Sequence, residues 1–147
     1  MSATRRAEVT WNGELITGHG VVTAASSGAF TELPVTWAAR TEGPAGKTSP
    51  EELVAAAHAS CYAMSFSGVL KRAGTPPDRL SVSADITFDN VDGGWKVVSS
   101  VLTVRGVVPG MSADAFVAAA ETAKDRCPIS QALKGNVELS VDAALEG

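Results

Sequence analysis

A long apolar segment with a clear helix start is the feature that most constrains the fold of this chain. Ser49 is a favourable N-cap residue, Pro50 suits the first helical position, and Glu52 stands three residues after the cap, as in a capping box. The predicted helix covers about residues 49–73 and ends before Gly74 and two prolines. Its middle is apolar all round, so we expect neighbouring elements to cover it on more than one side.

Alternating polar and apolar residues predict strands on both sides of this helix. Residues 1–48 form a strand region, in which Asn12-Gly13 favours a tight hairpin turn and Pro34 marks an edge strand. The later predicted elements are a hairpin at about 80–108, two helices at about 112–134 and a last strand at about 137–143. A length of 147 residues fits one domain. The order predicts a single α+β domain over 1–147 with antiparallel sheet.

The composition is that of a globular protein and argues against several classes of protein. Hydrophobic residues make up 45% of the chain and charged residues 19%, which excludes a disordered chain. A net charge of −4 argues against nucleic acid as the main partner. No apolar run follows Arg5-Arg6, and the apolar segment 53–70 is alanine-rich and interrupted by polar residues. We therefore expect a cytoplasmic protein with neither an export signal nor a membrane span.

Cys61 and Cys127 are the only two thiols, which excludes a disulfide-rich scaffold and an all-cysteine zinc site. In a reducing cytosol a disulfide between two such cysteines is transient and catalytic; the alternative is two unrelated buried thiols. Cys61 lies in the middle of the predicted helix, so a reactive thiolate there needs positive charge from elsewhere. Cys127 precedes Pro128, which predicts a break between two helices. The spacing leaves open which thiol attacks first.

The two histidines allow a further hypothesis. His58 stands three residues before Cys61 and shares its helix face, so a Cys–His nucleophile or a metal site is conceivable. A packed, hydrogen-bonded core histidine is the simpler interpretation of His58, and His19, between two glycines, is expected at the surface. A Cys–His hydrolase would also need an oxyanion or orienting motif, which we do not recognise in the sequence.

Two cysteine motifs resemble those of the OsmC/Ohr family of thiol-dependent organic hydroperoxide reductases, and of its OsmC branch in particular. The motifs are SPEELVAAAHASCYAM at 49–64 and AKDRCPISQAL at 123–133, and the segments AARTEG at 38–43 and TWNGELITGHG at 10–20 are similar as well. The resemblance covers essentially the whole chain. It implies an intertwined homodimer in which antiparallel sheets pack on long central helices and the active sites lie at the subunit interface.

The resemblance also implies site residues and an activity. Cys61 would be the peroxidatic cysteine, Cys127 the resolving cysteine, and Arg40 and Glu51 the active-site arginine and glutamate. The implied reaction reduces organic hydroperoxides, and less well hydrogen peroxide, through a Cys61 sulfenic acid and a Cys61–Cys127 disulfide, in defence against oxidative stress. No metal or other cofactor is implied, and an external dithiol, for example a lipoylated protein, would reduce the disulfide. The alternative is a non-catalytic dimer of the same fold that binds a small ligand or senses stress.

Helix geometry tests one part of the implied site. Glu51 and Cys61 are ten residues apart, which is about 15 Å along one helix and about 80° around its axis. The two side chains cannot touch within a continuous helix. If both belong to one site, either the helix is broken or Glu51 comes from a second chain.

Overall fold

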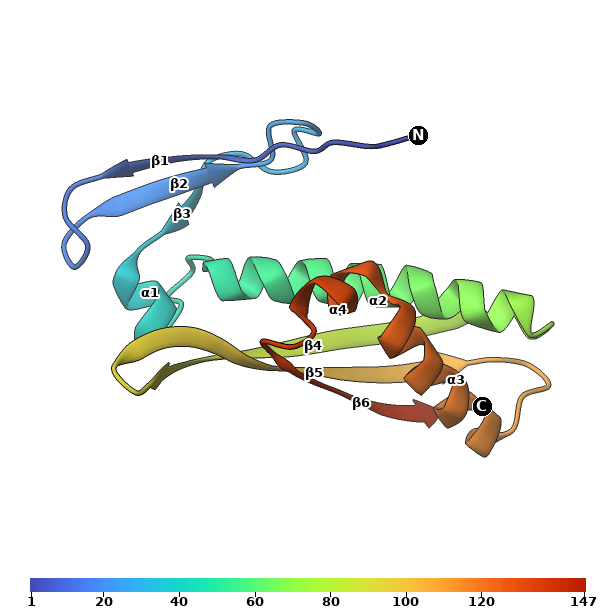
Figure 1. Ribbon diagram of the computed structural model, residues 1–147. Helices are drawn as coiled ribbons and strands as arrows, with labels where there is room; N and C mark the ends of the chain where they lie inside the picture. Colours follow the sequence, from blue (N-terminus) through green and yellow to red (C-terminus); the bar gives the residue numbers. More distant parts are fainter. The chain divides into compact units, whose positions relative to one another are not determined.

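The computed structural model describes all residues from Met1 to Gly147. The chain forms two compact units, Met1–Leu53 and Val54–Gly147. The boundary falls within the long helix α2 (Pro50–Arg72), whose first turn belongs to the first unit and whose remainder belongs to the second. Figure 1 labels the elements of both units.

The first unit contains a three-stranded antiparallel sheet in the order β1-β2-β3. Its strands are β1 (Glu8–Asn12), β2 (His19–Thr23) and β3 (Leu33–Val35). The edge position of β3 confirms the interpretation of Pro34, which cannot donate a ladder hydrogen bond.

The prediction of a tight turn at Asn12-Gly13 was wrong, because Asn12 pairs with His19 and residues 13–18 form a longer loop. This loop satisfies its own polar groups. The Gly18 N–H donates to the Glu14 carbonyl oxygen at 2.8 Å, and the Glu14 carboxylate accepts from the Thr17 N–H. These local hydrogen bonds stabilise the longer loop, although the Asn-Gly pair by itself favours a two-residue turn.

A short helix, α1 (Trp37–Thr41), follows β3 and was not predicted. Thr36 is its N-cap: the residue is extended (φ −143°, ψ 160°), and its hydroxyl accepts a hydrogen bond from the Ala39 N–H at 3.1 Å. Five residues are too few to show a helical period in the sequence. The helix matters because it carries Arg40 in its last turn.

Helix α2 begins where the capping signals place it. The Ser49 hydroxyl accepts a hydrogen bond from the Glu52 N–H at 3.1 Å, which is the first half of the predicted capping box. The Glu52 carboxylate accepts instead from the Thr48 hydroxyl at 2.7 Å. From Pro50 the helix runs without a break to Arg72, over 23 residues.

In the second unit, β4 (Arg79–Val91) and β5 (Gly94–Val107) form an antiparallel hairpin. Its turn is Asp92-Gly93, with φ values of 52° and 83°, which is the left-handed backbone that a two-residue hairpin turn needs. The last strand, β6 (Glu138–Leu145), pairs with β5 in parallel. The expectation of a wholly antiparallel sheet is therefore wrong for this pair.

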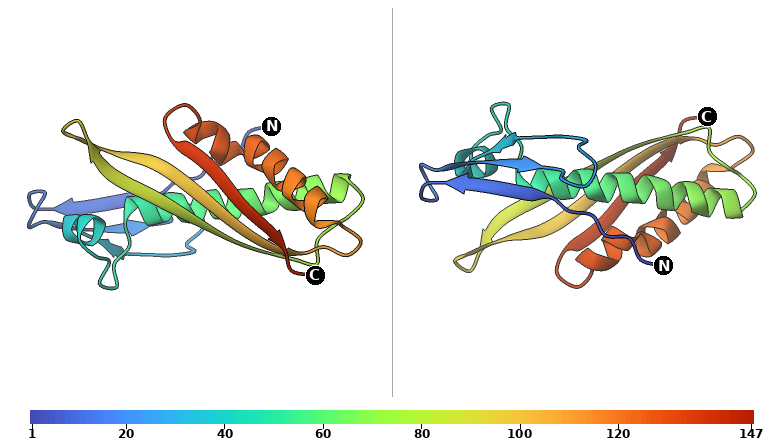
Figure 2. Two further views of the ribbon diagram at one scale, coloured as in Figure 1. Left: turned by 90° about the horizontal axis from the view of Figure 1, so that it is seen from below. Right: turned by 90° about the horizontal axis from the view of Figure 1, so that it is seen from above.

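The parallel pairing follows from the two helices between β5 and β6, α3 (Ala113–Arg126) and α4 (Pro128–Leu133). A crossover of this length carries the chain back to the start of β5, which a short turn cannot do. In both views of Figure 2, α2, α3 and α4 lie on the same face of the β4-β5-β6 sheet. The apolar side of the sheet and the three helices enclose the core.

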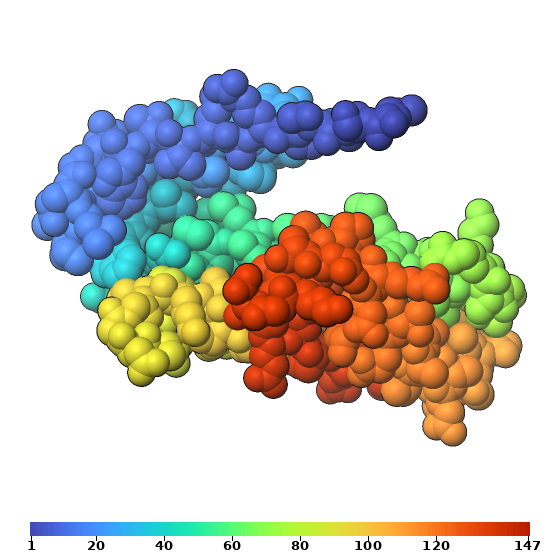
Figure 3. Space-filling view, viewed as in Figure 1, coloured from blue at the N-terminus to red at the C-terminus, as the bar shows by residue number.

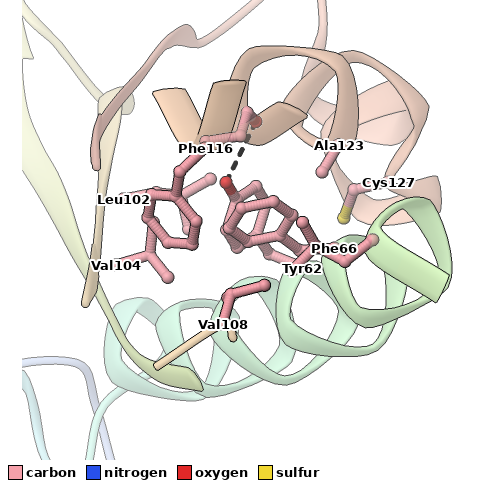
Figure 4. Close-up of a cluster of buried hydrophobic side chains, with 10 residues drawn as sticks. Tyr62, Phe66, Leu102, Val104, Val108, Phe116, Ala123 and Cys127 are labelled. Carbon is pink, nitrogen blue, oxygen red and sulfur yellow. Dashed lines mark hydrogen bonds between the residues drawn. The ribbon is translucent and has the colours of Figure 1, made fainter. Parts of the chain in front are cut away.

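Aromatic side chains fill this core, as Figure 4 shows. The Phe66 ring lies 5.6 Å from that of Tyr62 and 5.1 Å from that of Phe116, measured between ring centroids. The Tyr62 hydroxyl donates to the Ala120 carbonyl oxygen at 3.0 Å, so its buried polar end is satisfied. On α2 the core residues recur every four positions and form one buried stripe: His58, Tyr62, Phe66 and Leu70.

The other side of α2 is more open in the single chain. Met64 is 74% exposed, and Ala56, Ala57 and Ser60 are exposed as well. By length and composition alone α2 could cross a membrane. The polar residues of the segment therefore do not exclude a span by length and composition. Core helices of soluble proteins pass the same test, so this is weak evidence for a membrane.

Candidate functional site

The two cysteines lie at the contact between α2 and the α3–α4 junction, and both are free thiols. Cys61 is partly buried on α2, beside the core. Cys127 is fully buried and is the N-cap residue of α4, with Pro128 at the first helical position. The helix break that Pro128 predicts is confirmed, because α3 ends at Arg126 and α4 begins at Pro128. Figure 3 shows the surface of these two helices in orange to red.

The surroundings of Cys61 do not favour a thiolate within its own unit. Burial raises the pKa of the Cys61 thiol, and this effect outweighs a hydrogen bond from the Ile129 backbone, which lowers the pKa. The neighbouring Cys127 thiol raises the pKa further, through a hydrogen bond and through charge repulsion. The structure therefore brings the two predicted cysteines together. None of the groups that shift the pKa of Cys61 is a cation.

Arg40 and Glu51 form the second predicted pair, which lies in the first unit. The Arg40 Nε donates to both carboxylate oxygens of Glu51 at 3.0 Å, and its Nη2 donates to Oε1 at 2.7 Å. Glu51 is only 8% exposed, so its charge is removed from water and compensated by the guanidinium. The Arg40 guanidinium carbon also lies 5.7 Å from the centre of the Trp37 ring. These contacts fix the orientation of the guanidinium.

An apolar cavity of about 360 Å³ adjoins Arg40 in the first unit. Its lining is Val9, Trp11, Leu15, Val22, Val35, Thr36, Trp37, Arg40, Pro50 and Leu53. Trp37 lines this cavity, whereas Phe66 is in the core of the second unit and Met64 is exposed.

His58 is a buried core residue whose two ring nitrogens are both occupied. Nδ1 lies 2.7 Å from the Ser100 Oγ and Nε2 lies 2.8 Å from the Ser130 Oγ. A Cys–His nucleophile with Cys61 is therefore not formed. No group of three His, Cys, Asp or Glu side chains is arranged to hold a metal ion. The two serines were missed by the sequence reasoning, because neither lies in a recognisable local motif.

The spacing of Glu51 and Cys61 can now be interpreted. Because α2 is continuous from Pro50 to Arg72, the broken-helix arrangement is excluded. The two side chains stay about 15 Å apart along the helix axis.

The fold and the neighbouring free thiols describe an α+β dithiol protein. The family model of the OsmC-like proteins matches residues 43–142. A relative named peroxiredoxin OsmC, from Escherichia coli, is 36% identical over 139 residues, which cover 95% of this chain and 96% of the relative. The chain belongs to the OsmC family.

Further comparisons agree with this assignment. An organic hydroperoxide resistance protein from Xanthomonas axonopodis is 28% identical over 66% of this chain and 67% of its own length. Among solved structures, the organic hydroperoxide resistance protein OhrB of Bacillus subtilis has a TM-score of 0.72 at 24% identity, covering 94% of this chain and 97% of that one. The OsmC-like protein of Mycoplasma pneumoniae has a TM-score of 0.71 at 15% identity, covering 99% of each chain. These structures share the fold.

Proposed function

We propose that this protein is a cysteine-based peroxidase that reduces organic hydroperoxides, and less well hydrogen peroxide, to alcohols or water in defence against oxidative stress. Its relatives named peroxiredoxin OsmC and organic hydroperoxide resistance protein support a hydroperoxide-reducing enzyme. The observation that carries the proposal for this chain is the contact between the free thiols of Cys61 and Cys127. A dithiol placed in this way can be oxidised and reduced in a cycle.

The proposed cycle has three steps. The Cys61 thiolate attacks one oxygen of the O–O bond, which breaks; the alkoxide leaves and takes a proton to become the alcohol, and Cys61 becomes a sulfenic acid. The Cys127 thiolate then attacks the Cys61 sulfur, and the hydroxyl leaves as water once it takes a proton. An external dithiol reduces the resulting disulfide by exchange. The cycle needs no metal, haem or flavin.

The first step requires positive charge near Cys61, because burial raises the pKa of this thiol. We propose that Arg40 supplies the charge and that Glu51 holds the guanidinium in place. In the same position Arg40 would stabilise the negative charge that develops on the leaving oxygen.

We further propose that the site is completed in a homodimer. Glu51 stays about 15 Å from the Cys61 of its own chain along the unbroken α2, so we infer that the Arg40–Glu51 pair of one copy serves the Cys61 of the other. The exposed side of α2 around Met64 offers an apolar surface that a second copy would cover. In this assembly residues 1–147 act as one OsmC-like domain.

The cavity beside Arg40 suggests the class of substrate. Its lining is almost entirely aliphatic and aromatic, with Arg40 as the one charged group. We propose that it takes the alkyl part of an organic hydroperoxide while the peroxide group faces the guanidinium. For the reductant we propose a small dithiol such as a lipoyl group, and for the location the cytoplasm.

Turnover of cumene hydroperoxide with dihydrolipoamide as the reductant tests the function. We expect the wild-type protein to turn over and the Cys61→Ser variant to be inactive. One equivalent of hydroperoxide should also consume two thiols per wild-type chain. Wild-type turnover in the Cys61→Ser variant would contradict the mechanism. Binding of the hydroperoxide without any turnover would favour the alternative of a binding protein.

A further inference from the structure

His58 connects three elements of the second unit through two buried serines. Its Nδ1 lies 2.7 Å from the Oγ of Ser100 on β5, and its Nε2 lies 2.8 Å from the Oγ of Ser130 on α4. His58 and Ser100 are fully buried and Ser130 is 2% exposed. The hydrogen bonds therefore form without competition from water, and the loss of one leaves a buried polar group without its partner.

The network is complete when the imidazole is neutral. A neutral ring has one N–H donor and one acceptor nitrogen, and a serine hydroxyl can fill either role. Burial lowers the pKa of His58, which agrees with a neutral ring at physiological pH. Both nitrogens are used in these contacts, so the ring is not available as a base for the thiols.

The position of the network relative to the two cysteines suggests its role. His58 lies three residues before Cys61, so both are on one face of α2. Ser130 lies three residues after Cys127, in the helix that Cys127 begins. The His58–Ser130 hydrogen bond therefore joins the two thiol-bearing helices about one turn away from each sulfur.

Helix α4 has few restraints of its own. It has only six residues, and the Cys127 side chain makes no capping hydrogen bond. The buried His58–Ser130 bond is therefore an important restraint on the first turn of α4, beside the bond from the Ile129 backbone to Cys61. A short helix of this kind would otherwise shift easily.

We propose that His58 is a positioning residue for the resolving step: its bond to Ser130 holds Cys127 where its thiolate can attack Cys61. This inference rests on the proposed function. In that step the Cys127 sulfur forms a bond to the Cys61 sulfur while the S–O bond of the sulfenic acid breaks, and the hydroxyl leaves as water after gaining a proton. Attack on sulfur needs an aligned approach, so a small displacement of α4 slows it.

The test uses two matched variants, Ser130→Ala and Ser100→Ala. Each removes one hydroxyl from the same imidazole, but only Ser130 lies on a thiol-bearing helix. Reduced protein is mixed with dithiodipyridine, a small aromatic disulfide, in place of a peroxide. Attack by Cys61 releases one thiopyridone, and closure by Cys127 on the mixed disulfide releases a second. The Cys127→Ser variant, which should release only one equivalent, identifies the first phase.

We expect Ser130→Ala to slow the second phase about fivefold, which corresponds to the loss of one buried hydrogen bond, and to leave the first phase unchanged. Ser100→Ala should keep the second phase within about twofold of the wild-type rate. With hydroperoxide as the oxidant, the Cys61 sulfenic acid of Ser130→Ala should be trapped by dimedone in higher yield than that of Ser100→Ala.

A wild-type second phase in Ser130→Ala, or equal slowing in both variants, would overturn the positioning role. A wild-type protein without a second phase would overturn it as well. If the two phases behave as expected but no variant reacts with hydroperoxide, the proposed peroxidase function fails and the positioning role of His58 stands. The aromatic disulfide therefore distinguishes the two failures.

Discussion

Arg40 and Glu51 are joined by a bidentate ion pair, in which the Arg40 Nε lies 3.0 Å from both carboxylate oxygens and Nη2 lies 2.7 Å from Oε1. Glu51 is nearly buried and Arg40 is partly buried. The planar guanidinium fits both oxygens at once, which a lysine ammonium cannot do. The ion pair therefore fixes the orientation of the guanidinium, and with it the direction in which its positive charge acts.

Replacing the carboxylate should lower peroxidase activity. Glu51→Gln removes the charge and one acceptor, so the guanidinium is held less firmly, and we expect kcat/KM for cumene hydroperoxide to fall about tenfold to a hundredfold. The matched control is Glu52→Gln, the exposed neighbour, which should stay close to wild type. Unchanged kcat/KM in a folded Glu51→Gln protein would remove this residue from the mechanism.

The arginine should lower the pKa of the peroxidatic thiol in the working protein. Burial raises the pKa of Cys61 within its own unit, so loss of Arg40 should move its ionisation to higher pH. The rate of alkylation by iodoacetamide, measured against pH in a Cys127→Ser background, reports this ionisation. We expect Arg40→Leu to shift the curve upward and the exposed-site control Arg6→Leu to leave it in place. Coincident curves for all three proteins would contradict the proposed role.

Stability should fall on mild acidification because of His58. Burial lowers the pKa of His58 below its ordinary value of 6.5, so the unfolded chain binds more protons than the folded one as pH falls through 6.5. The free energy of unfolding contributed by this residue is therefore fully present above pH 6.5 and is lost toward the lower folded-state pKa. One proton accounts for a slope of at most about 1.4 kcal/mol per pH unit.

Urea unfolding between pH 7.5 and about pH 5 measures this slope. His58→Gln keeps a donor and an acceptor for the two serines but does not titrate, so its slope should be smaller. His19→Gln, which removes the exposed histidine, should keep the wild-type slope. Equal slopes in wild type and His58→Gln would show that another group causes the pH dependence.

Two glycines of β5 should respond oppositely to an added methyl group. A Cβ at Gly106 would lie 2.7 Å from two ring atoms of Phe116 and 3.0 Å from the Leu80 Cδ2, all in the packed core. We expect Gly106→Ala to cost about 1–3 kcal/mol in the free energy of unfolding. A Cβ at Gly94 meets only the Val91 carbonyl oxygen, at 3.8 Å, so Gly94→Ala should be neutral or slightly stabilising. Equal stability of the two variants would contradict this account of the core.

Local signals predicted the parts of the fold that local interactions determine. The start of α2 follows from Ser49 and Pro50, and the break at Cys127 follows from Pro128. The five-residue α1 has only the Thr36 cap as a signal. The parallel pairing of β5 with β6 depends on how the α3–α4 crossover returns over the sheet, and no residue spacing encodes that path.

The residues of the candidate site also fall into those that local motifs predict and those that only the fold reveals. Cys61, Cys127, Arg40 and Glu51 stand in recognisable motifs, and the structure shows that they form two contacting pairs. The partners of His58 could not be predicted. Ser100 and Ser130 are 42 and 72 residues away, and serine is too common a residue to be singled out without the fold.

If the site is shared between two chains as proposed, the unbroken α2 has a genetic consequence. Suppose that one allele encodes the Cys61→Ser protein and another encodes the Glu51→Gln protein. The homodimers of each protein are defective. When both are expressed together, random pairing makes about half of the dimers mixed, and each mixed dimer contains one site with an intact thiol and an intact carboxylate. About a quarter of all sites are then complete, so two defective alleles complement each other. An enzyme whose sites lay within single chains would show no such rescue.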